Sequence, residues 1–253
     1  GAWIAPTVAA LGARVLGLSA SRTREALGIA EYHGPRSQMM RTIDAPTMVK
    51  DGSGWGAMAG VSAAYLAADG FTGAPAVSFE DPELADIWSD LGHRWYVHEQ
   101  YIKLYPVCRW AQPAVEAVLS LKERHAITAA DVAAIRVETF HEATRLSTIP
   151  TTTEQAQYSL PFSVAAALVR GTIGVAEVSG SGLKDADILG HARRVVAVET
   201  EDFNAVFPAK RRAVVALTLH SGRVLRSGVT EAQGDPEARL PQFIVDRKFR
   251  TLV

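Results

Sequence analysis

Three basic residues are the first candidates for chemistry on a negatively charged molecule: Lys50, Lys103 and Arg109. Lysine supplies a movable positive charge, and arginine binds a carboxylate through two parallel hydrogen bonds. Preorganised cations of this kind stabilise the negative charge that builds beside a carboxylate when an acid loses water or carbon dioxide. The three residues therefore predict a site for an anionic substrate. The alternative for each of them is a position on the surface, in contact with solvent or in an ion pair.

Other chemical groups are sparse. Such reactions need a general base, but the histidines are scattered and none belongs to a motif that we identify. Cys108 is the only cysteine, so an iron–sulfur cluster has too few ligands, and no Cys/His spacing is typical of a zinc site. The glycine-rich turn at residues 52–54 lacks the lysine of a phosphate-binding loop. We therefore expect no metal and no nucleotide cofactor.

Composition narrows the class of protein further. The chain has 253 residues, of which 48% are hydrophobic, and a formal net charge of −1. This length allows one large domain or two smaller ones with a sizeable core. The near-neutral charge argues against a nucleic-acid partner, and no apolar run is long enough to span a membrane. With a single cysteine, no internal disulfide can form, and the cytoplasm is the expected compartment.

The first part of the chain reads as helical. Alanine, leucine and valine at helical spacing predict a helix over residues 3–18, and Ser21 is a candidate N-cap for a second helix that ends near Ala30. Residues 32–53 show no periodicity and predict a structured loop. The helix predicted over residues 55–68 is rich in glycine and alanine, which let backbones approach closely, so we expect it to be buried among other helices.

The pattern changes near Trp95 to a mixture of strands and helices. An α+β fold follows, with part of an all-helical domain at residues 1–90, a smaller α+β lid domain with antiparallel strands at 91–233, and a return to the helical domain at 234–253. The predicted strands are 96–105, 135–140, 194–199, 212–220 and 224–229. The predicted helices are 113–124, 159–170 with Pro161 in its first turn, and a last one that begins at 243.

Three stretches carry a resemblance to a known family. They are MVKDGSGWGA at residues 48–57, KLYPVCRW at 103–110 and EQAQYSLPF at 154–162, and each leads into a helix. In their order and spacing they resemble the MmgE/PrpD family, which includes 2-methylcitrate dehydratase, cis-aconitate decarboxylase and iminodisuccinate epimerase. The resemblance runs from Gly12 to about Phe249.

The resemblance implies a protein with a helical domain and an α+β lid, dimeric in most members, with a metal-independent active site in the cleft between the two domains. It implies that Lys50 and Lys103 are active-site residues, and we add Arg109 from its chemistry. The remaining motif residues that we expect to contact the substrate are Tyr105, Cys108, Gln112, Ser159 and Phe162.

The sequence also departs from the family pattern. Phe162 stands where tyrosine is common and lacks its phenolic hydroxyl, and Gln112 stands where histidine is often found. Family members are longer and draw an aspartate and histidines from an N-terminal helical segment that is not in this sequence. We therefore expect the general base to lie outside this chain, and little turnover from the chain alone.

Three functions remain open at this stage. The first is a lyase, most simply a dehydratase similar to 2-methylcitrate dehydratase, acting on a small polycarboxylate. The second is an epimerase or decarboxylase of the same family, since all these reactions cleave a bond beside a carboxylate. The third is a catalytically incomplete fragment that serves as a binding or subunit-interface module. The residues above do not separate them, and they do not specify the substrate.

Overall fold

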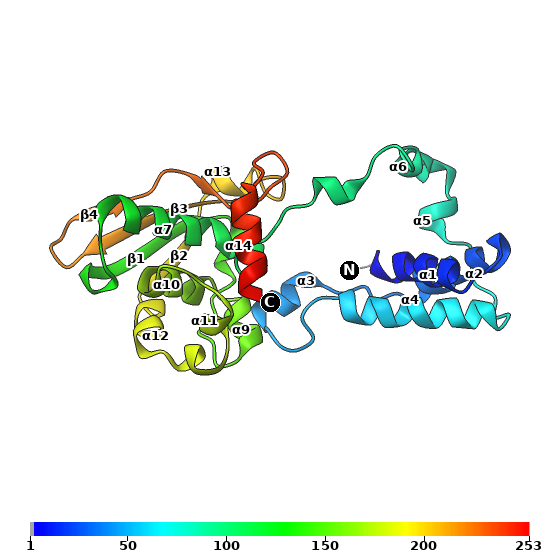
Figure 1. The fold of residues 1–253 in the computed structure, drawn as a ribbon, viewed down its shortest axis with the longest axis horizontal. Helices are drawn as coiled ribbons and strands as arrows, with labels where there is room; N and C mark the ends of the chain where they lie inside the picture. The colour runs from blue at the N-terminus through cyan, green and yellow to red at the C-terminus, as the bar shows by residue number, and fades with distance from the viewer. Residues whose placement is uncertain (1–2, 253) are drawn as a thin grey trace. The chain divides into compact units, whose positions relative to one another are not determined.

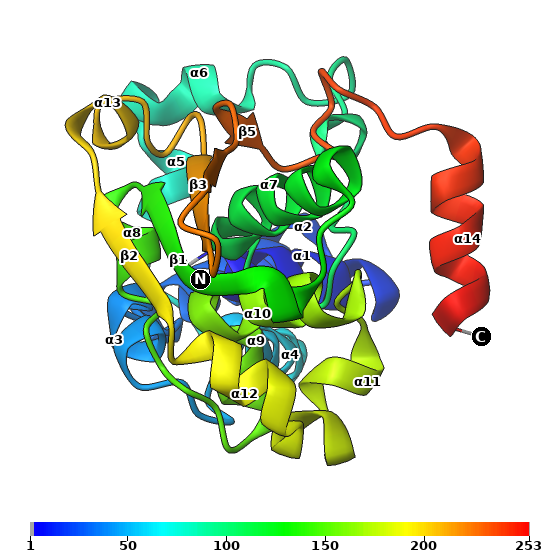
Figure 2. The same ribbon diagram turned by 90° about the vertical axis from the view of Figure 1, so that its left-hand side faces the viewer.

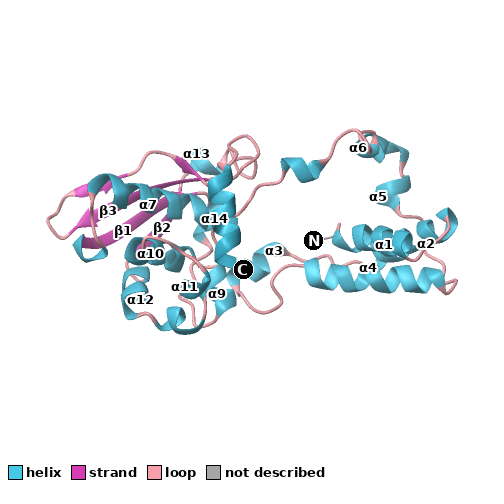
Figure 3. Ribbon diagram, viewed as in Figure 1, coloured by secondary structure: helices cyan, strands magenta, loops and turns pink. Residues whose placement is uncertain are grey.

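The computed structural model describes residues 3–252. They divide into two compact units (Figures 1 and 3). The first unit comprises residues 3–42 and 49–96, and the second comprises residues 43–48 and 97–252. The predicted α+β class is confirmed, because the first unit is helical and the second holds a sheet with helices. The domain boundaries that we assigned from the sequence remain a prediction.

Three helices form the centre of the first unit: α1 (Ile4–Val15), α2 (Ala20–His33) and α4 (Ser53–Ala68). Ser19 is the N-cap of α2, and its Oγ accepts a hydrogen bond from the Arg22 backbone N at 3.3 Å. The prediction of Ser21 as the cap was wrong. Ser19 has the extended backbone that a cap requires, whereas Ser21 already lies inside the helix.

Glycine lets α4 approach α1 closely. A Cβ atom on Gly60 would lie 2.5 Å from the carbonyl oxygen of Ala5 and 2.7 Å from the Cβ of Val8. The opposite face of α4 carries Trp55, Met58 and other large side chains, which are exposed. The prediction that α4 is buried among helices was therefore right for its small-residue face and wrong for the rest.

Short helices lie between and after these three helices, and one of them, α3, begins in the first unit and ends in the second. Arg24 of α2 and Glu80 of α5 form an ion pair at 2.6 Å. The predicted loop at residues 32–53 holds one helical turn, α3, so it is less irregular than expected. These helices are α3 (Met39–Asp44), α5 (Val77–Glu80), η1 (Pro82–Leu84) and α6 (Ala85–Trp88).

The second unit is built on a five-stranded sheet with the order β2-β1-β3-β4, in which β5 also pairs with β3. Strand β3 is antiparallel to β1, β4 and β5, as predicted, but β2 is parallel to β1. A parallel pair needs a crossover connection, and the helices between β1 and β2 supply it. The strands are β1 (Val132–Thr139), β2 (Val195–Glu199), β3 (Arg212–Leu219), β4 (Val224–Arg226) and β5 (Thr230–Glu231).

Two helices, α7 (Gln112–His125) and α10 (Leu160–Arg170), lie along the same side of this sheet (Figures 1 and 2). Pro161 lies in the first turn of α10 as predicted, Ser159 is the N-cap of this helix, and every residue from Leu160 to Leu168 is buried. A helix that is apolar all round is typical of the centre of a core.

The remaining elements are η2 (Tyr96–Glu99), η3 (Arg109–Ala111), η4 (Ala129–Asp131), α8 (His141–Thr144), α9 (Thr153–Gln157), α11 (Val175–Val178), η5 (Gly180–Lys184), α12 (Ala186–Ala192), α13 (Glu201–Asn204) and α14 (Gln242–Leu252).

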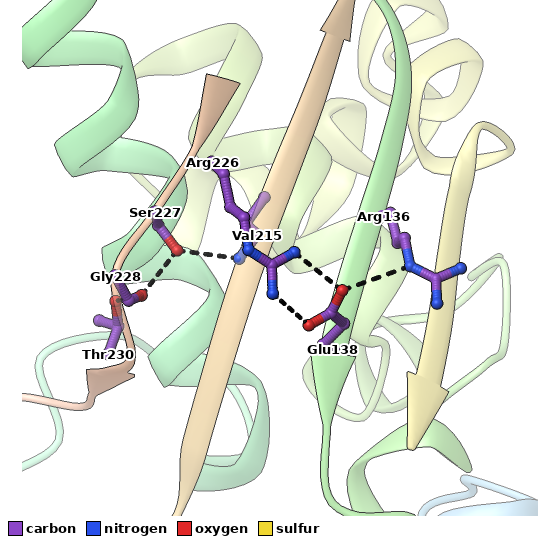
Figure 4. Close-up of polar contacts among 7 residues, drawn as sticks. All are labelled: Arg136, Glu138, Val215, Arg226, Ser227, Gly228 and Thr230. Atoms are coloured by element: carbon purple, nitrogen blue, oxygen red, sulfur yellow. Dashed lines mark hydrogen bonds and ion pairs between the residues drawn. The ribbon is translucent and has the colours of Figure 1, made fainter. Parts of the chain in front are cut away.

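The other side of the sheet carries a polar network (Figure 4). The guanidinium group of Arg226 on β4 reaches across β3 and donates to both carboxylate oxygens of Glu138 on β1, at 2.8 and 2.6 Å. Arg136 approaches the same carboxylate at 3.5 Å. The small side chain of Ala216 lies in register between Arg136 and Arg226 and leaves room for this contact. These contacts therefore link β4 to β1 across β3.

The strand predicted over residues 96–105 does not form. Tyr96–Glu99 is a 3-10 turn, and the chain that follows is irregular up to η3. An apolar run becomes a strand only when a neighbouring strand pairs with it. Here the Ile102 backbone N donates to the Gly234 carbonyl at 2.9 Å, but residues 96–105 do not form a ladder around this bond. Among residues 3–252, no helix is both long and apolar enough to cross a bilayer.

Candidate active site

Five of the predicted site residues lie in one segment, residues 103–112, which leads into η3 and α7. Lys103 is exposed, and its carbonyl oxygen accepts a hydrogen bond from the Nζ of Lys248 on α14. Burial lowers the pKa of Lys248, and the nearby charge of Lys103 lowers it further. Two positive charges therefore lie next to each other at the start of the segment, with no carboxylate bonded to either among the described residues.

Arg109 is enclosed by the protein. Only 4% of its side chain is exposed. Its Nη2 donates to the Asp235 carboxylate at 2.6 Å and the Ala232 carbonyl at 3.2 Å, and its Nη1 donates to the Gln233 carbonyl at 2.7 Å. The guanidinium group also stacks 4.5 Å from the ring centre of Tyr101. These contacts join the loop after β5 to η3, and the predicted contact of Arg109 with substrate stays a prediction.

Gln112, Ser159 and Phe162 also have internal partners. The Gln112 side chain donates to the carbonyls of Tyr105 and Val107 at 3.2 and 3.1 Å, and it accepts from Arg109. Ser159 Oγ donates to the Thr148 carbonyl at 2.5 Å. Gln112 is 1% exposed, and Ser159 and Phe162 are 0% exposed. Their predicted contact with substrate stays a prediction, and their observed contacts shape the segment.

Tyr105 is hydrogen-bonded to an acid that the sequence analysis missed. The Tyr105 hydroxyl donates to Glu116 Oε1 at 2.9 Å, and the Gln233 side chain donates to Glu116 Oε2 at 3.0 Å. Burial raises the pKa of Glu116, and the hydrogen bonds from Tyr105 and Gln233 oppose that rise. Burial also raises the pKa of Tyr105, and Glu116 adds to it. Glu116 lies one helical turn after Gln112 on α7. This spacing in the sequence could have placed Glu116 on the same side of the helix as Gln112, a predicted site residue.

Cys108 is half-buried just before η3, and its backbone N donates to the Gln157 carbonyl at 2.7 Å. Burial raises the pKa of its thiol. A backbone hydrogen bond from Trp110 and the charges of Lys103 and Arg211 oppose that rise. Arg211, which the sequence analysis also missed, therefore lies close enough to Cys108 for its charge to act there.

Lys50 belongs to the first unit and has a positive backbone φ of 53°. A non-glycine residue with a left-handed backbone is uncommon, and such residues occur preferentially at functional sites. The next residue, Asp51, accepts a hydrogen bond from the Ser53 backbone N at 2.9 Å at the start of α4, and this bond is the main cause of its lowered pKa. Because Lys50 and Lys103 lie in different units, their convergence on one substrate remains a prediction.

The second unit thus presents a set of cations around the 103–109 segment: Lys103, Lys248 and Arg211. Such a set can bind a carboxylate and stabilise an anion that forms beside it. Among residues 3–252, no group of three or more histidine, cysteine, aspartate or glutamate side chains is placed to hold a metal ion.

Two domain models of one known protein family match successive parts of the chain. The model of the MmgE/PrpD N-terminal domain matches residues 1–89, and that of the MmgE/PrpD C-terminal domain matches residues 105–253. A search of curated proteins gave no match.

Proposed function

Since the chain belongs to the MmgE/PrpD family, we propose that it acts on a small polycarboxylate as a metal-independent lyase that removes water, similar to 2-methylcitrate dehydratase. Family membership supports acid–base chemistry beside a carboxylate. The observation that carries the choice of an anionic substrate is the pairing of Lys103 with Lys248, two cations that share no carboxylate in the described structure. Such a pair repels itself when empty and attracts an anion.

The proposed reaction breaks a C–H bond beside a carboxylate and a C–O bond on the next carbon. A base takes the proton, and the hydroxyl group leaves as water after it gains a proton. Negative charge accumulates on the carboxylate next to the carbon that loses the proton, and Lys103 stabilises it there. Lys50 supplies a second cation to the substrate. Arg109 holds the loop at residues 232–235 in place and is a positioning residue in this proposal.

Two other functions share this chemistry. An epimerase would return the proton to the opposite face of the same carbon, and a decarboxylase would release carbon dioxide and place a proton on the carbon. A binding module would hold the polycarboxylate without changing it. The identity of the bond that breaks separates these functions.

Proton NMR in deuterated water detects each outcome with a purified protein that carries the general base together with this chain. With 2-methylcitrate we expect the methyl doublet to be replaced by a methyl singlet, because the carbon that bears the methyl group enters the double bond, and with citrate we expect a vinyl signal. Deuterium in the substrate without these new signals would instead indicate an epimerase, and loss of carbon dioxide from cis-aconitate would indicate a decarboxylase. Absence of both conversion and binding for every polycarboxylate tested would overturn the proposal.

Lys103→Gln tests the role of the cation. A group that stabilises charge only in the transition state typically contributes about 10²–10³ in kcat, so kcat should fall by about that factor. Lys184→Gln is the matched control, because Lys184 is exposed on η5 and makes no side-chain contact that the structure records. Equal activity of the two variants would contradict the assignment of Lys103.

We also propose a homodimer in the cytoplasm, as the family resemblance implies. Light scattering coupled to size-exclusion chromatography measures the mass in solution directly. A monomer at all concentrations would contradict the dimer without affecting the proposed reaction.

A further inference from the structure

Three consecutive basic residues, Lys210, Arg211 and Arg212, lie at the start of β3. The outer two share one acid on β5: Lys210 Nζ lies 3.5 Å from Glu231 Oε2, and Arg212 Nε lies 2.8 Å from Glu231 Oε1. Successive side chains of an extended chain point to opposite sides. Arg211 therefore faces away from Glu231, and the acid that neutralises its neighbours does not reach it.

The guanidinium group of Arg211 is poorly satisfied by the protein. Its Nε is buried and has no hydrogen-bond partner within the described part of the chain. Arg211 also makes no ion pair among residues 3–252, in contrast to Arg109, which donates to four acceptors. Buried polar groups are almost always hydrogen-bonded, and the exceptions require an explanation such as a ligand.

The surroundings of Arg211 indicate what such a ligand would be. The charges of Arg211 and Lys103 both oppose the rise that burial causes in the pKa of the Cys108 thiol, so both cations act at the same side chain. Lys248 adds a third positive charge next to Lys103. A group that approaches Cys108 meets several cations, and Arg211 among them has no ion-pair partner within residues 3–252 and a buried Nε without a hydrogen bond.

We propose that Arg211 is a substrate-binding residue that holds one carboxylate of the polycarboxylate beside Cys108, while Lys103 interacts with another. The inference rests on the proposed function and extends it, because it assigns the arginine that selects a substrate with at least two carboxylates. The planar fork of arginine matches a carboxylate in two hydrogen bonds, which a lysine cannot reproduce. Substrates with a single carboxylate lose this interaction and bind more weakly.

The position of Arg211 is tested through Cys108, which is the only cysteine of the chain. Intact-mass spectrometry then reports alkylation of this one thiol. The rate with the anion iodoacetate, divided by the rate with neutral iodoacetamide, measures the positive charge beside it. We expect Arg211→Gln to lower this ratio by about threefold to tenfold, as removal of one charge that acts on the thiol requires. The ratio should be unchanged in Arg223→Gln, since Arg223 is exposed in the β3–β4 turn.

Carboxylate binding is tested by the protection of Cys108 with citrate. Citrate should slow iodoacetamide alkylation of the wild-type protein, and Arg211→Gln should require at least about tenfold more citrate for the same protection, as loss of a charge-assisted hydrogen bond requires. Arg211→Lys retains the charge, so its alkylation ratio should stay near the wild-type value while its citrate protection weakens. Far-ultraviolet circular dichroism of each variant establishes that it is folded.

Each outcome has a definite consequence. An unchanged alkylation ratio in Arg211→Gln would place the guanidinium group away from Cys108 and overturn the inference. A lowered ratio with unchanged citrate protection would also overturn it, because Arg211 would then be near the site without binding the carboxylate. Turnover of a polycarboxylate by a wild-type protein that citrate does not protect would refute the Arg211 site alone. Absence of both turnover and protection would refute the proposed function as well.

Discussion

Arg109 and Arg211 differ in what surrounds their guanidinium groups, and this difference decides the function we assign to each. Arg109 has backbone carbonyls, Gln112 and Asp235 as acceptors, and a tyrosine ring stacks on it. The buried Nε of Arg211 has no partner among the described residues. An arginine whose terminal nitrogens donate to the protein stabilises the fold. An arginine whose terminal nitrogens make no such hydrogen bonds can use them to bind a ligand.

At this scale we predict that Arg109→Met destabilises the protein strongly. Removing one partner of a buried ion pair leaves the other partners uncompensated and costs about 3–5 kcal/mol. Urea unfolding, together with hydrogen exchange of the α7 amides, measures the loss. Asp235→Asn should have a smaller effect, because Asp235 is 30% exposed and can be solvated. Stability within about 1 kcal/mol of wild type, combined with lost substrate binding, would favour the original assignment of Arg109 as a substrate ligand.

At the scale of elements, the contact between α1 and α4 depends on residues without side chains. Gly60 faces the α1 backbone, whereas Gly54, in the first turn of the same helix, faces open space. Gly60→Ala forces the two helices apart and should destabilise the first unit by about 1–3 kcal/mol. Gly54→Ala should stabilise it by about 0.5–1 kcal/mol, because alanine loses less backbone entropy in a helix. Thermal unfolding of the two variants compares the same substitution in one helix, and effects of the same sign would contradict the packing described here.

The sheet supplies a second prediction at this scale, on the contact between Arg226 and Glu138 (Figure 4). The hydrogen bond from Arg226 is the main reason that the pKa of Glu138 lies below its ordinary value of 4.5. A carboxyl group with a lowered pKa in the folded state stabilises the fold above its unfolded pKa, and this stabilisation disappears as the pH falls through the folded-state pKa.

We therefore expect Glu138→Gln to cost about 0.5–1 kcal/mol at neutral pH, with the cost limited by solvent screening of the half-exposed Arg226. The difference from wild type should vanish in acid, and urea unfolding across this pH range measures it. The double variant Glu138→Gln/Arg226→Gln gives the coupling between the two residues. A difference that persists unchanged below the folded-state pKa would show that packing, and not charge, is responsible.

At the scale of the whole molecule, the net charge and the local charge make opposite predictions for an anionic ligand. The chain carries a net charge of −1, which by itself weakly repels a polycarboxylate. The cations around the 103–109 segment attract it locally. Net charge governs long-range encounter, whereas the charges that line a site determine binding there.

We predict that citrate binding weakens as salt is added. Raising NaCl from about 0.1 M to about 1 M shortens the Debye length from about 10 Å to about 3 Å, and the affinity should fall by at least about tenfold. Isothermal titration calorimetry at several salt concentrations measures this dependence. Arg211→Gln should show a smaller decrease than wild type, and Arg223→Gln the same decrease. An affinity that rises with salt would mean that the net charge dominates and that no local cation site binds the ligand.

Much of the local structure followed from sequence patterns alone. Pro161 predicted the start of α10, because a proline in the first turn of a helix has no intrahelical N–H hydrogen bond to lose. Alternating residues predicted β2 and β3, since a strand with one buried face shows this period, and valine, threonine and phenylalanine predicted β1. The three motifs also indicated the family, which the domain matches then showed.

Tertiary structure decided the features that depend on a partner distant in sequence. The apolar run at residues 96–105 needed a neighbouring strand to pair with, and the direction of β2 depended on the helical crossover that connects it to β1. The same reason explains the arginines. Arg109 resembles a substrate ligand in the sequence, but residues more than a hundred positions away occupy its donors, while nothing in the described fold occupies the Nε of Arg211. A sequence specifies which groups can make an interaction, and only the folded chain specifies which of them are already engaged.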